Sequence, residues 1–147
     1  MNNFKYSIPT TIYFGKDQLG HLSELKERGS KVLLVYGGGR IKRSGLYDAA
    51  MKVLQEAGLT VRGLSGVEPN PRIESVRKGV ELCKADAIEM VLAIGGGSVI
   101  DCAKVVAAGA CYEGDAWDLV LDGSKIKAAL PVYSVLTLSA TGSEMDE

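Results

Sequence analysis

The chain has 147 residues, 46% of them hydrophobic and 24% charged, and it carries a formal net charge of −1 at pH 7. That length fits one domain able to bury its own core, and the near-zero charge argues against a protein that binds nucleic acid or anionic membranes mainly by electrostatics. No apolar run approaches the roughly 20 residues that span a bilayer, and the first residues lack the apolar segment of a secretory signal.

The first two predicted elements lie before residue 30. Residues 6–14 (YSIPTTIYF) are rich in β-formers and predict a strand, which Pro9 would place at the edge of a sheet. Residues 17–28 predict a helix, with Asp17 as a possible N-cap and Gly29 as the residue that stops it.

The next stretch alternates strand-like and helix-like patterns. Residues 31–36 (KVLLVY) are almost continuously apolar, which indicates a strand buried on both faces. Residues 45–57 keep apolar side chains on one helical face, and Gly58 ends that helix. Residues 59–64 predict a weaker strand, and the GVEPNP sequence at 66–71 predicts a loop.

The same alternation continues through the second half. Residues 72–86 predict a helix with one apolar stripe, and 90–94 (MVLAI) predict a second buried strand. A mostly apolar helix is expected at 98–110, a helical turn at 115–121 and a last strand at 131–136. This β-α-β-α rhythm predicts an α/β fold, a Rossmann-like parallel sheet with helices on both faces. No linker divides the chain, so we expect residues 1–147 to form one domain.

The three cysteines indicate the redox environment in which the protein works. Cys83, Cys102 and Cys111 are odd in number and form no CxxC pair, which speaks against a disulfide framework or a zinc site. We expect them to be buried small side chains in a reducing, cytoplasmic environment.

Two runs of three glycines follow the two buried strands, at 37–39 and at 95–97. Ligands of open α/β sheets bind outside the carboxyl ends of the strands. Glycine lets backbone amides approach a ligand closely and tolerates positive φ, and a helix N-terminus adds free N–H donors and partial positive charge. Neither run fits the GxGxxG pattern, because Lys42 and Ile100 stand where its third glycine would be, and GxxxxGK[ST] is absent. Two such turns still favour a nucleotide phosphate site.

Polar residues beside these turns extend the candidate site. Ser98 and Asp101 are three residues apart and share one helical face, so Asp101 could accept a hydrogen bond from a cofactor. Arg40 follows the first glycine run and could pair with a ribose 2′-phosphate. No acidic residue ends that strand to accept both ribose hydroxyls, as NAD sites commonly require. The pattern therefore slightly favours NADP over NAD.

Four motifs, taken together, resemble the iron-dependent alcohol dehydrogenases, in particular their butanol dehydrogenase and aldehyde reductase branch. They are YGGGRIKRSGLYD (36–48), EPNP (68–71), AIGGGSVIDCAK (93–104) and LSATGSE (138–144). The resemblance covers the whole chain and implies the N-terminal cofactor domain of a dehydroquinate synthase-like fold. It also implies a metal-dependent enzyme that interconverts primary alcohols and aldehydes by hydride transfer to NAD(P).

The resemblance implies roles for individual residues. It places the second glycine turn with Ser98 at the pyrophosphate, Asp101 at the nicotinamide end, and the first glycine turn with Arg40 at the adenosine ribose. It adds Asn70 at the cofactor cleft and Thr137, Leu138 and Thr141 at the adenine and phosphate side. The family commonly has asparagine where Asp146 stands, so Asp146 is not counted. The expected cofactor-binding residues are Gly37, Gly38, Gly39, Arg40, Asn70, Gly95, Gly96, Gly97, Ser98, Asp101, Thr137, Leu138 and Thr141.

The family's metal, Fe or Zn, would be held by one aspartate and three histidines of a helical C-terminal domain. This sequence has one histidine, His21, in a predicted helix far from either glycine turn, where a surface or packing role is expected. We therefore expect no metal or catalytic residue within 1–147, a metal-binding domain outside it, and no turnover of alcohol by the isolated chain.

Two other functions stay open on the sequence alone. One is a nucleotide-binding or regulatory module without catalysis, and the other is a relative of dehydroquinate synthase or glycerol dehydrogenase. Expected partners are the dinucleotide and an alcohol or aldehyde, with no nucleic acid and no membrane, and a homodimer is expected because an uncovered apolar face favours self-association.

Overall fold

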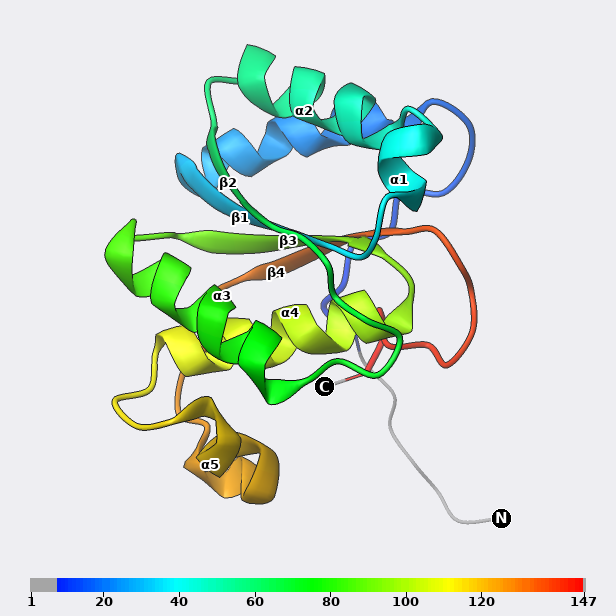
Figure 1. Cartoon of the computed structure of the whole chain (residues 1–147). Coiled ribbons are helices and arrows are strands. Elements are labelled where there is room, and N and C mark those ends of the chain that lie inside the picture. Colours follow the sequence, from blue (N-terminus) through cyan, green and yellow to red (C-terminus); the bar gives the residue numbers. More distant parts are fainter. Residues whose placement is uncertain (1–7, 147) are drawn as a thin grey trace.

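The two most continuously apolar strands form the centre of the sheet in the computed structural model, which describes residues 8–146. They are β1 (Lys31–Tyr36) and β3 (Met90–Gly95), flanked by β2 (Thr60–Leu64) and β4 (Val132–Leu136) in the order β2-β1-β3-β4. All three neighbouring pairs are parallel. The α/β fold expected from the sequence is thereby confirmed (Figure 1).

Helices cover both faces of this sheet. The helices η1 (Gln18–Glu27) and α2 (Leu46–Glu56) lie on one face, and α3 (Ile73–Ala85) and α4 (Gly97–Ala110) lie on the other (Figure 1). Each βαβ crossover is thus completed by a helix that buries an apolar stripe against the strands. Among residues 8–146, no helix has the length and apolar character needed to cross a bilayer.

Alternating side chains of the central strands supply two separate cores. Leu33 packs into the cluster beneath α3 and α4, whereas Leu34 packs into the cluster beneath η1 and α2, and both are 0% exposed. The same alternation holds in β3, where Val91 and Leu92 face opposite clusters. Both faces of a parallel sheet are covered, which explains why these strands are apolar at every position.

Three short elements complete the chain. A single-turn helix α1 (Arg40–Arg43) precedes α2 and was not expected from the sequence, since only four residues lie between the glycine run and Ser44. Helix α5 (Ala116–Leu121) matches the expected helical turn and begins at Asp115, whose carboxylate accepts from the amide of Trp117 (2.9 Å). The turn η2 (Gly123–Lys125) follows it.

The expected N-terminal strand is wrong for the residues that the structure describes. Residues 8–14 form no strand, while positions 6 and 7 lie outside the described residues. Instead, the Tyr13 ring stacks on His21 with centroids 3.7 Å apart, and its hydroxyl donates to Glu24 Oε2 at 2.6 Å. A β-rich sequence becomes a strand only beside a strand that can share its hydrogen bonds, and this segment lies against η1.

The helix expected at 17–28 is present as the 3₁₀ helix η1, and Asp17 is its N-cap residue as expected, although without a side-chain cap. Asp17 adopts φ of +59° and its side chain makes no capping hydrogen bond. Gly29 follows the helix as expected. Glycine fits there because a Cβ would lie only 2.7 Å from Glu89 Oε2.

The cysteines are buried at two of three positions. Burial raises the pKa of the Cys83 thiol to about 12 and that of Cys102 to about 11, so both stay protonated near neutral pH. Cys111, at the end of α4, is exposed, which corrects the expectation that all three are buried.

Candidate functional site

Both glycine runs lie at the carboxyl edge of the sheet, on adjacent strands. Tyr36 is the register partner of Ile94, and Gly95 is the register partner of Leu136. The chain leaves β1 towards β2 on one side and later returns to β3 on the other side. The two glycine runs therefore flank the switch point, where open α/β sheets bind their ligands.

The second glycine run joins β3 directly to α4. Gly95 ends the strand, Gly96 is the N-cap residue, and Gly97 and Ser98 form the first turn of the helix. The Gly96 carbonyl accepts from the amides of Val99 and Ile100. No acceptor for the amides of Gly97 and Ser98 is found within residues 8–146. Two free amides at the positive end of a 14-residue helix form a suitable anion site.

Steric crowding explains why this turn needs glycine. None of the six glycines in the two runs has positive φ, so these turns do not use glycine's tolerance of left-handed backbone. A Cβ at Gly95 would lie 2.7 Å from Val99 Cγ2. At Gly97 it would lie 3.0 Å from Ser143 Oγ and 3.1 Å from Thr141 Oγ1. The turn packs its own helix and the segment after β4 too closely for side chains.

The loop after β2 is held against both glycine turns. The amide of Gly66 donates to the carbonyl of Gly37 (3.0 Å), and the Ser98 hydroxyl donates to the carbonyl of Pro69. Asn70 is the next residue and is exposed. The EPNP loop therefore borders both glycine turns, and the place at a cofactor cleft that the resemblance implies for Asn70 stays a prediction.

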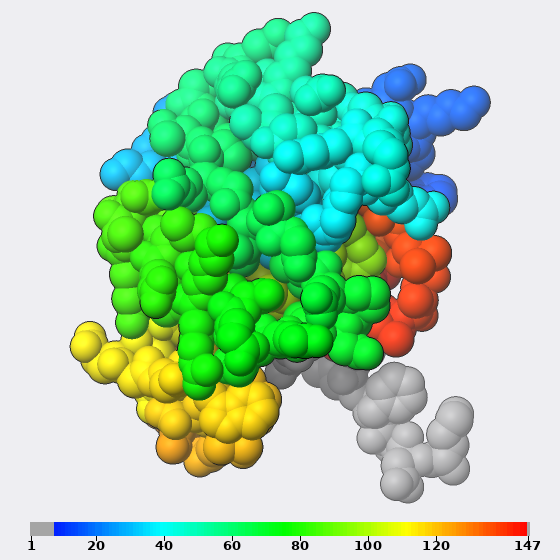
Figure 2. Space-filling view, in the orientation of Figure 1, coloured from blue at the N-terminus to red at the C-terminus, as the bar shows by residue number. Residues whose placement is uncertain are grey.

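The segment after β4 reaches the same place from the other side. The Thr137 amide donates to the Gly95 carbonyl (3.0 Å), and a Cβ at Gly96 would lie 3.7 Å from Leu138 Cβ. In the space-filling view the cyan turn after β1, the green loop after β2 and the red segment after β4 gather on one side of the molecule (Figure 2). Thr137, Leu138 and Thr141 thus lie on the segment that packs against the second glycine turn.

Two candidate residues stand apart from these contacts. Asp101 is exposed one turn along α4 from Ser98. Arg40 is exposed at the first position of α1. Neither takes part in a side-chain hydrogen bond or ion pair within residues 8–146, which leaves both charges available to a ligand.

The helix α1 concentrates positive charge beside the first glycine run. It contributes Arg40, Lys42 and Arg43, and none of them forms an ion pair with another residue of the described chain. Lys42 Nζ lies 5.3 Å from the ring centroid of Tyr36 and 4.9 Å from that of Tyr47, a cation–π arrangement that holds it over the end of β1.

The single histidine does not belong to this site. His21 Nδ1 lies 2.6 Å from Glu24 Oε1 in η1, and the ring stacks on Tyr13. This is the surface and packing role that the sequence predicted. Within residues 8–146, no group of three or more His, Cys, Asp or Glu side chains gathers in a way that could hold a metal ion.

Ser143 and Lys104 were given no role from the sequence, and Asp146 was left out of the expected site. Ser143 is 3% exposed and its hydroxyl lies 3.0 Å from that of Thr141. Lys104 of α4 donates to the backbone and the side chain of Asp146. Lys104 and Ser143 both lie inside the motifs AIGGGSVIDCAK and LSATGSE, but a local motif does not show which residues will be in contact.

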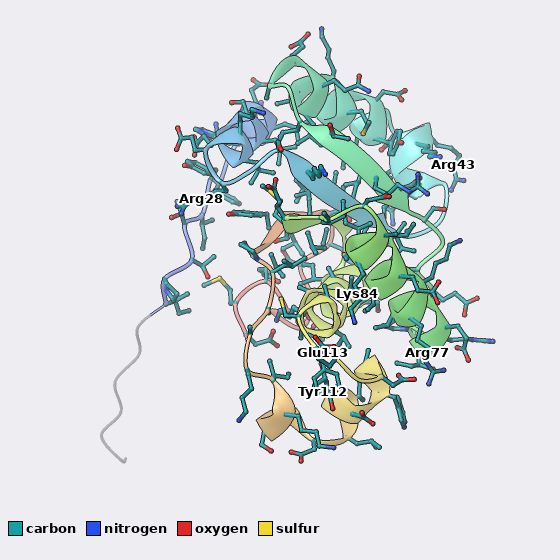
Figure 3. All side chains as sticks on the ribbon, turned by 90° about the vertical axis from the view of Figure 1, so that its left-hand side faces the viewer. Arg28, Arg43, Arg77, Lys84, Tyr112 and Glu113 are labelled. Carbon is teal, nitrogen blue, oxygen red and sulfur yellow. The ribbon has the colours of Figure 1, made fainter. Side chains whose placement is uncertain are left out.

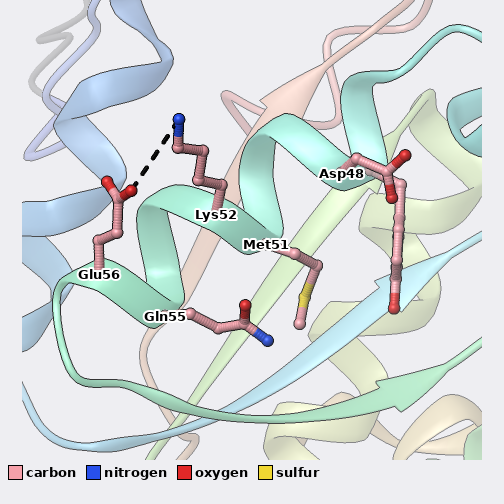
Figure 4. Close-up of a pocket in the computed structure, with 6 residues that line it drawn as sticks. Asp48, Met51, Lys52, Gln55 and Glu56 are labelled. Atoms are coloured by element: carbon pink, nitrogen blue, oxygen red, sulfur yellow. Dashed lines mark ion pairs between the residues drawn. The ribbon is translucent and has the colours of Figure 1, made fainter.

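A shallow hollow elsewhere on the surface carries no comparable chemistry. Its lining comes entirely from α2 and includes Tyr47, Met51 and Gln55, with Lys52 Nζ and Glu56 Oε1 4.0 Å apart (Figure 4). No residue of the loops at the strand ends lines it. At the glycine turns, by contrast, polar groups from several elements lie together.

A parallel sheet with two glycine turns at its switch point defines a Rossmann-like α/β domain. The chain belongs to the iron-containing alcohol dehydrogenase family, whose family model matches residues 9–147. This finding confirms the resemblance noted from the four motifs.

Individual relatives agree with that membership. The chain is 60% identical over 147 residues to NADH-dependent butanol dehydrogenase B of Clostridium acetobutylicum, covering 99% of this chain and 38% of that protein. It is 42% identical to the NADPH-dependent aldehyde reductase YqhD of Escherichia coli, with 98% and 38% covered. The crystal structure of NADH-dependent butanol dehydrogenase A from Thermotoga maritima superposes with a TM-score of 0.94 at 48% identity, over 99% of this chain and 37% of that one. The chain thus spans about 38% of the length of the curated relatives it matches.

Proposed function

We propose that this chain is the cofactor-binding part of an NAD(P)-dependent alcohol dehydrogenase that interconverts primary alcohols and aldehydes by hydride transfer. The observation that carries the proposal is the anion site at the switch point, where the free amides of Gly97 and Ser98 meet the positive end of α4. Family membership supports the reaction class, since the relatives are named butanol dehydrogenases and an aldehyde reductase.

The residues present fit a dinucleotide. The three residues of the Gly95–Gly97 turn carry no side chains of their own, and the free amides of Gly97 and Ser98 would donate to a diphosphate. The hydroxyl of Thr141 borders the same turn. Asp101, one turn further along α4, would accept from the nicotinamide end. The bound nicotinamide ring supplies the hydride, and this chain's residues hold and orient it.

The adenosine end would lie between the first glycine run and the loop carrying Asn70. Here we propose a preference for NADP over NAD, because Arg40 is exposed beside that run without an ion-pair partner in the described chain and could pair with a 2′-phosphate. Relatives of both kinds are known, as the NADH-dependent and NADPH-dependent names show. The basic sequence RIKR of α1 supports the choice of NADP.

The family's metal does not fit the described residues, since no suitable group of ligands gathers among them. We propose that residues 1–147 form one dinucleotide-binding domain, and that the ligands of an Fe or Zn ion belong to the part of the relatives that this chain does not span. A cytoplasmic homodimer is part of the same proposal, supported by Trp117, Val120 and Leu121, which are 44–70% exposed on α5.

Calorimetric titration of the chain with NADPH, NADH and ATP tests the proposal. We expect both dinucleotides to bind, with NADPH about tenfold tighter because a charge-assisted pair with Arg40 adds about 1.4 kcal/mol. Arg40→Ser should remove that preference. Arg28→Ser is the matched control. In Figure 3 Arg28 lies on the opposite side of the molecule from Arg43, which marks the position of α1.

The outcomes separate the alternatives. Tighter binding of ATP than of either dinucleotide would favour a nucleotide-binding module without catalysis. Equal affinities for NADPH and NADH, unchanged by Arg40→Ser, would leave the dehydrogenase assignment standing and refute the NADP preference.

A further inference from the structure

The segment 137–146 folds back over the N-terminal end of α4. In Figure 1 this red segment leaves β4, passes around that end of the helix and returns beneath it. It is attached near its start, where the Thr137 amide donates to the Gly95 carbonyl. In its middle, the hydroxyls of Thr141 and Ser143 pair with each other beside Gly97.

Lys104 holds the far end of this segment. Its ammonium donates to the Asp146 carbonyl at 2.6 Å and also to the Asp146 carboxylate. The Lys104 side chain is only 26% exposed, whereas that of Asp146 is 61% exposed. Long helical side chains point back towards the helix N-terminus, so Lys104 reaches towards the turn that carries the anion site.

We propose that Lys104 is a positioning residue of the dinucleotide site. Through Asp146 it fixes the segment 137–146 against the first turn of α4, so that Thr141 is kept beside the free amide of Gly97. The inference rests on the proposed function and extends it, because it assigns to Lys104 a role exerted through another residue instead of a contact with phosphate.

The alternative role makes an opposite prediction. If the Lys104 ammonium bound the diphosphate directly, Asp146 would compete for it, and removing that carboxylate would free a positive charge and strengthen binding of an anion. If Lys104 acts by holding the segment, removing the Asp146 side chain weakens binding. The sign of the change in the Asp146→Ala variant therefore separates the two roles.

The experiment titrates NADPH into the parent chain, Lys104→Met, Lys104→Arg, Asp146→Ala and Asp146→Asn. Lys104→Met should raise Kd about fivefold and Asp146→Ala about threefold, as expected for a partly buried charged contact. Lys104→Arg and Asp146→Asn keep a donor and an acceptor and should stay within about twofold of the parent. The amides of Thr137 and Met145 donate to the carbonyls of Gly95 and Gly142, and their hydrogen exchange should become faster in Lys104→Met without dinucleotide present.

Two controls remove similar contacts elsewhere. Lys84→Met deletes a lysine whose ammonium donates to the Tyr112 carbonyl at 2.7 Å, at the other end of α3 and α4 (Figure 3). Asp86→Ala deletes the carboxylate that pairs with Arg62 at 3.3 Å. Neither should change Kd or the exchange of the segment.

Each result decides the matter. Tighter binding in Asp146→Ala, or an unchanged Kd in Lys104→Met, would overturn the positioning role while leaving the proposed function intact. A parent chain that binds neither NADPH nor NADH would overturn the proposed function and this inference together.

Discussion

At the scale of single residues, the glycine turns are set by contact distances. Gly95 and Gly38 belong to equivalent runs, yet a Cβ at Gly95 would overlap Val99, whereas a Cβ at Gly38 would meet no atom within 4 Å. Neither residue has positive φ. The two positions differ in the space around them and also in their surroundings, because Gly95 is buried at the end of β3 whereas Gly38 is exposed.

Gly95→Ala should destabilise the fold by about 1–3 kcal/mol, the usual cost of forcing a methyl group into a packed site. The atoms closest to the added methyl group are Cβ, Cγ1 and Cγ2 of Val99. This branched side chain lies in the first turn of α4 and has little freedom to move. Urea denaturation measures the change, with Gly38→Ala as the matched control.

Gly38→Ala should stay within about 0.5 kcal/mol of the parent, because nothing crowds it. Equal destabilisation by both variants would show that the steric explanation is wrong and that backbone flexibility decides.

At the scale of elements, Glu89 joins the starts of the two central strands. Its carboxylate accepts from the amides of Ser30 (2.5 Å) and Lys31 (3.0 Å), just before β1, and Glu89 itself precedes β3. These backbone hydrogen bonds, the one from Ser30 first, lower the pKa of the Glu89 carboxyl from its usual value of 4.5. The charged form is therefore favoured in the folded state.

Glu89→Gln should lower the unfolding free energy at pH 7, and it should make the unfolding free energy fall less steeply as the pH is lowered. A carboxyl group with a lowered folded pKa stabilises the protein above its unfolded value of about 4.5 and loses that contribution as the pH falls through the folded pKa. The difference in unfolding free energy between the parent and Glu89→Gln should thus be largest near pH 7 and shrink below pH 4.5. Denaturation curves from pH 3 to 7 measure it.

A difference that stays constant or grows towards pH 3 would contradict this account. Glu56→Gln is the matched control, because Glu56 pairs only with Lys52 at 4.0 Å on the exposed surface of α2. It should leave the acid dependence close to that of the parent.

The elements differ in how far the sequence could predict them. The strands β1 and β3 were predictable because each is a short apolar run that ends at three glycines, which leaves few alternatives. The segment 8–14 has an equally β-rich composition, but whether it pairs depends on distant partners that a local pattern does not contain. The helix α1 was missed for a different reason, because a helix of four residues is too short to show a periodic pattern.

Parts of the candidate site were predictable for a similar reason. Each glycine turn follows its strand directly in the sequence, and Ser98 follows the second turn. The place of each turn is therefore fixed by the strand before it. The contact between Lys104 and Asp146 joins residues 42 positions apart, and the burial of Ser143 depends on how the segment after β4 folds back. Such contacts follow from the complete fold and not from any one motif.

At the scale of the whole molecule, the order of connections creates the site. Right-handed crossovers place α2 on one face and α3 and α4 on the other, so the connections leave β1 and β3 in opposite directions. The loops separate at that point and expose the amides of α4. A ligand bound there contacts loops from both halves of the sheet, and its binding free energy is therefore coupled to global unfolding.

NADPH should stabilise the parent chain, and Gly97→Ala should reduce that effect. A ligand at about 100 times its Kd adds about 2.7 kcal/mol to the unfolding free energy, which for a chain of this size raises Tm by about 5–10 °C. In Gly97→Ala the new Cβ displaces the hydroxyls of Thr141 and Ser143 from the turn, and we expect Kd to rise about tenfold.

At the same NADPH concentration, a tenfold weaker Kd reduces the gain to about 1.4 kcal/mol, or half of the parent's shift. Without NADPH, the variant's own stability should lie within about 1 kcal/mol of the parent's, because alanine favours the helix that begins at this residue and so offsets the crowding. Thermal unfolding with and without NADPH measures both quantities. An equal NADPH-induced shift in the two proteins would mean that the first turn of α4 is not where the dinucleotide binds, because a change at that turn would then leave its affinity untouched.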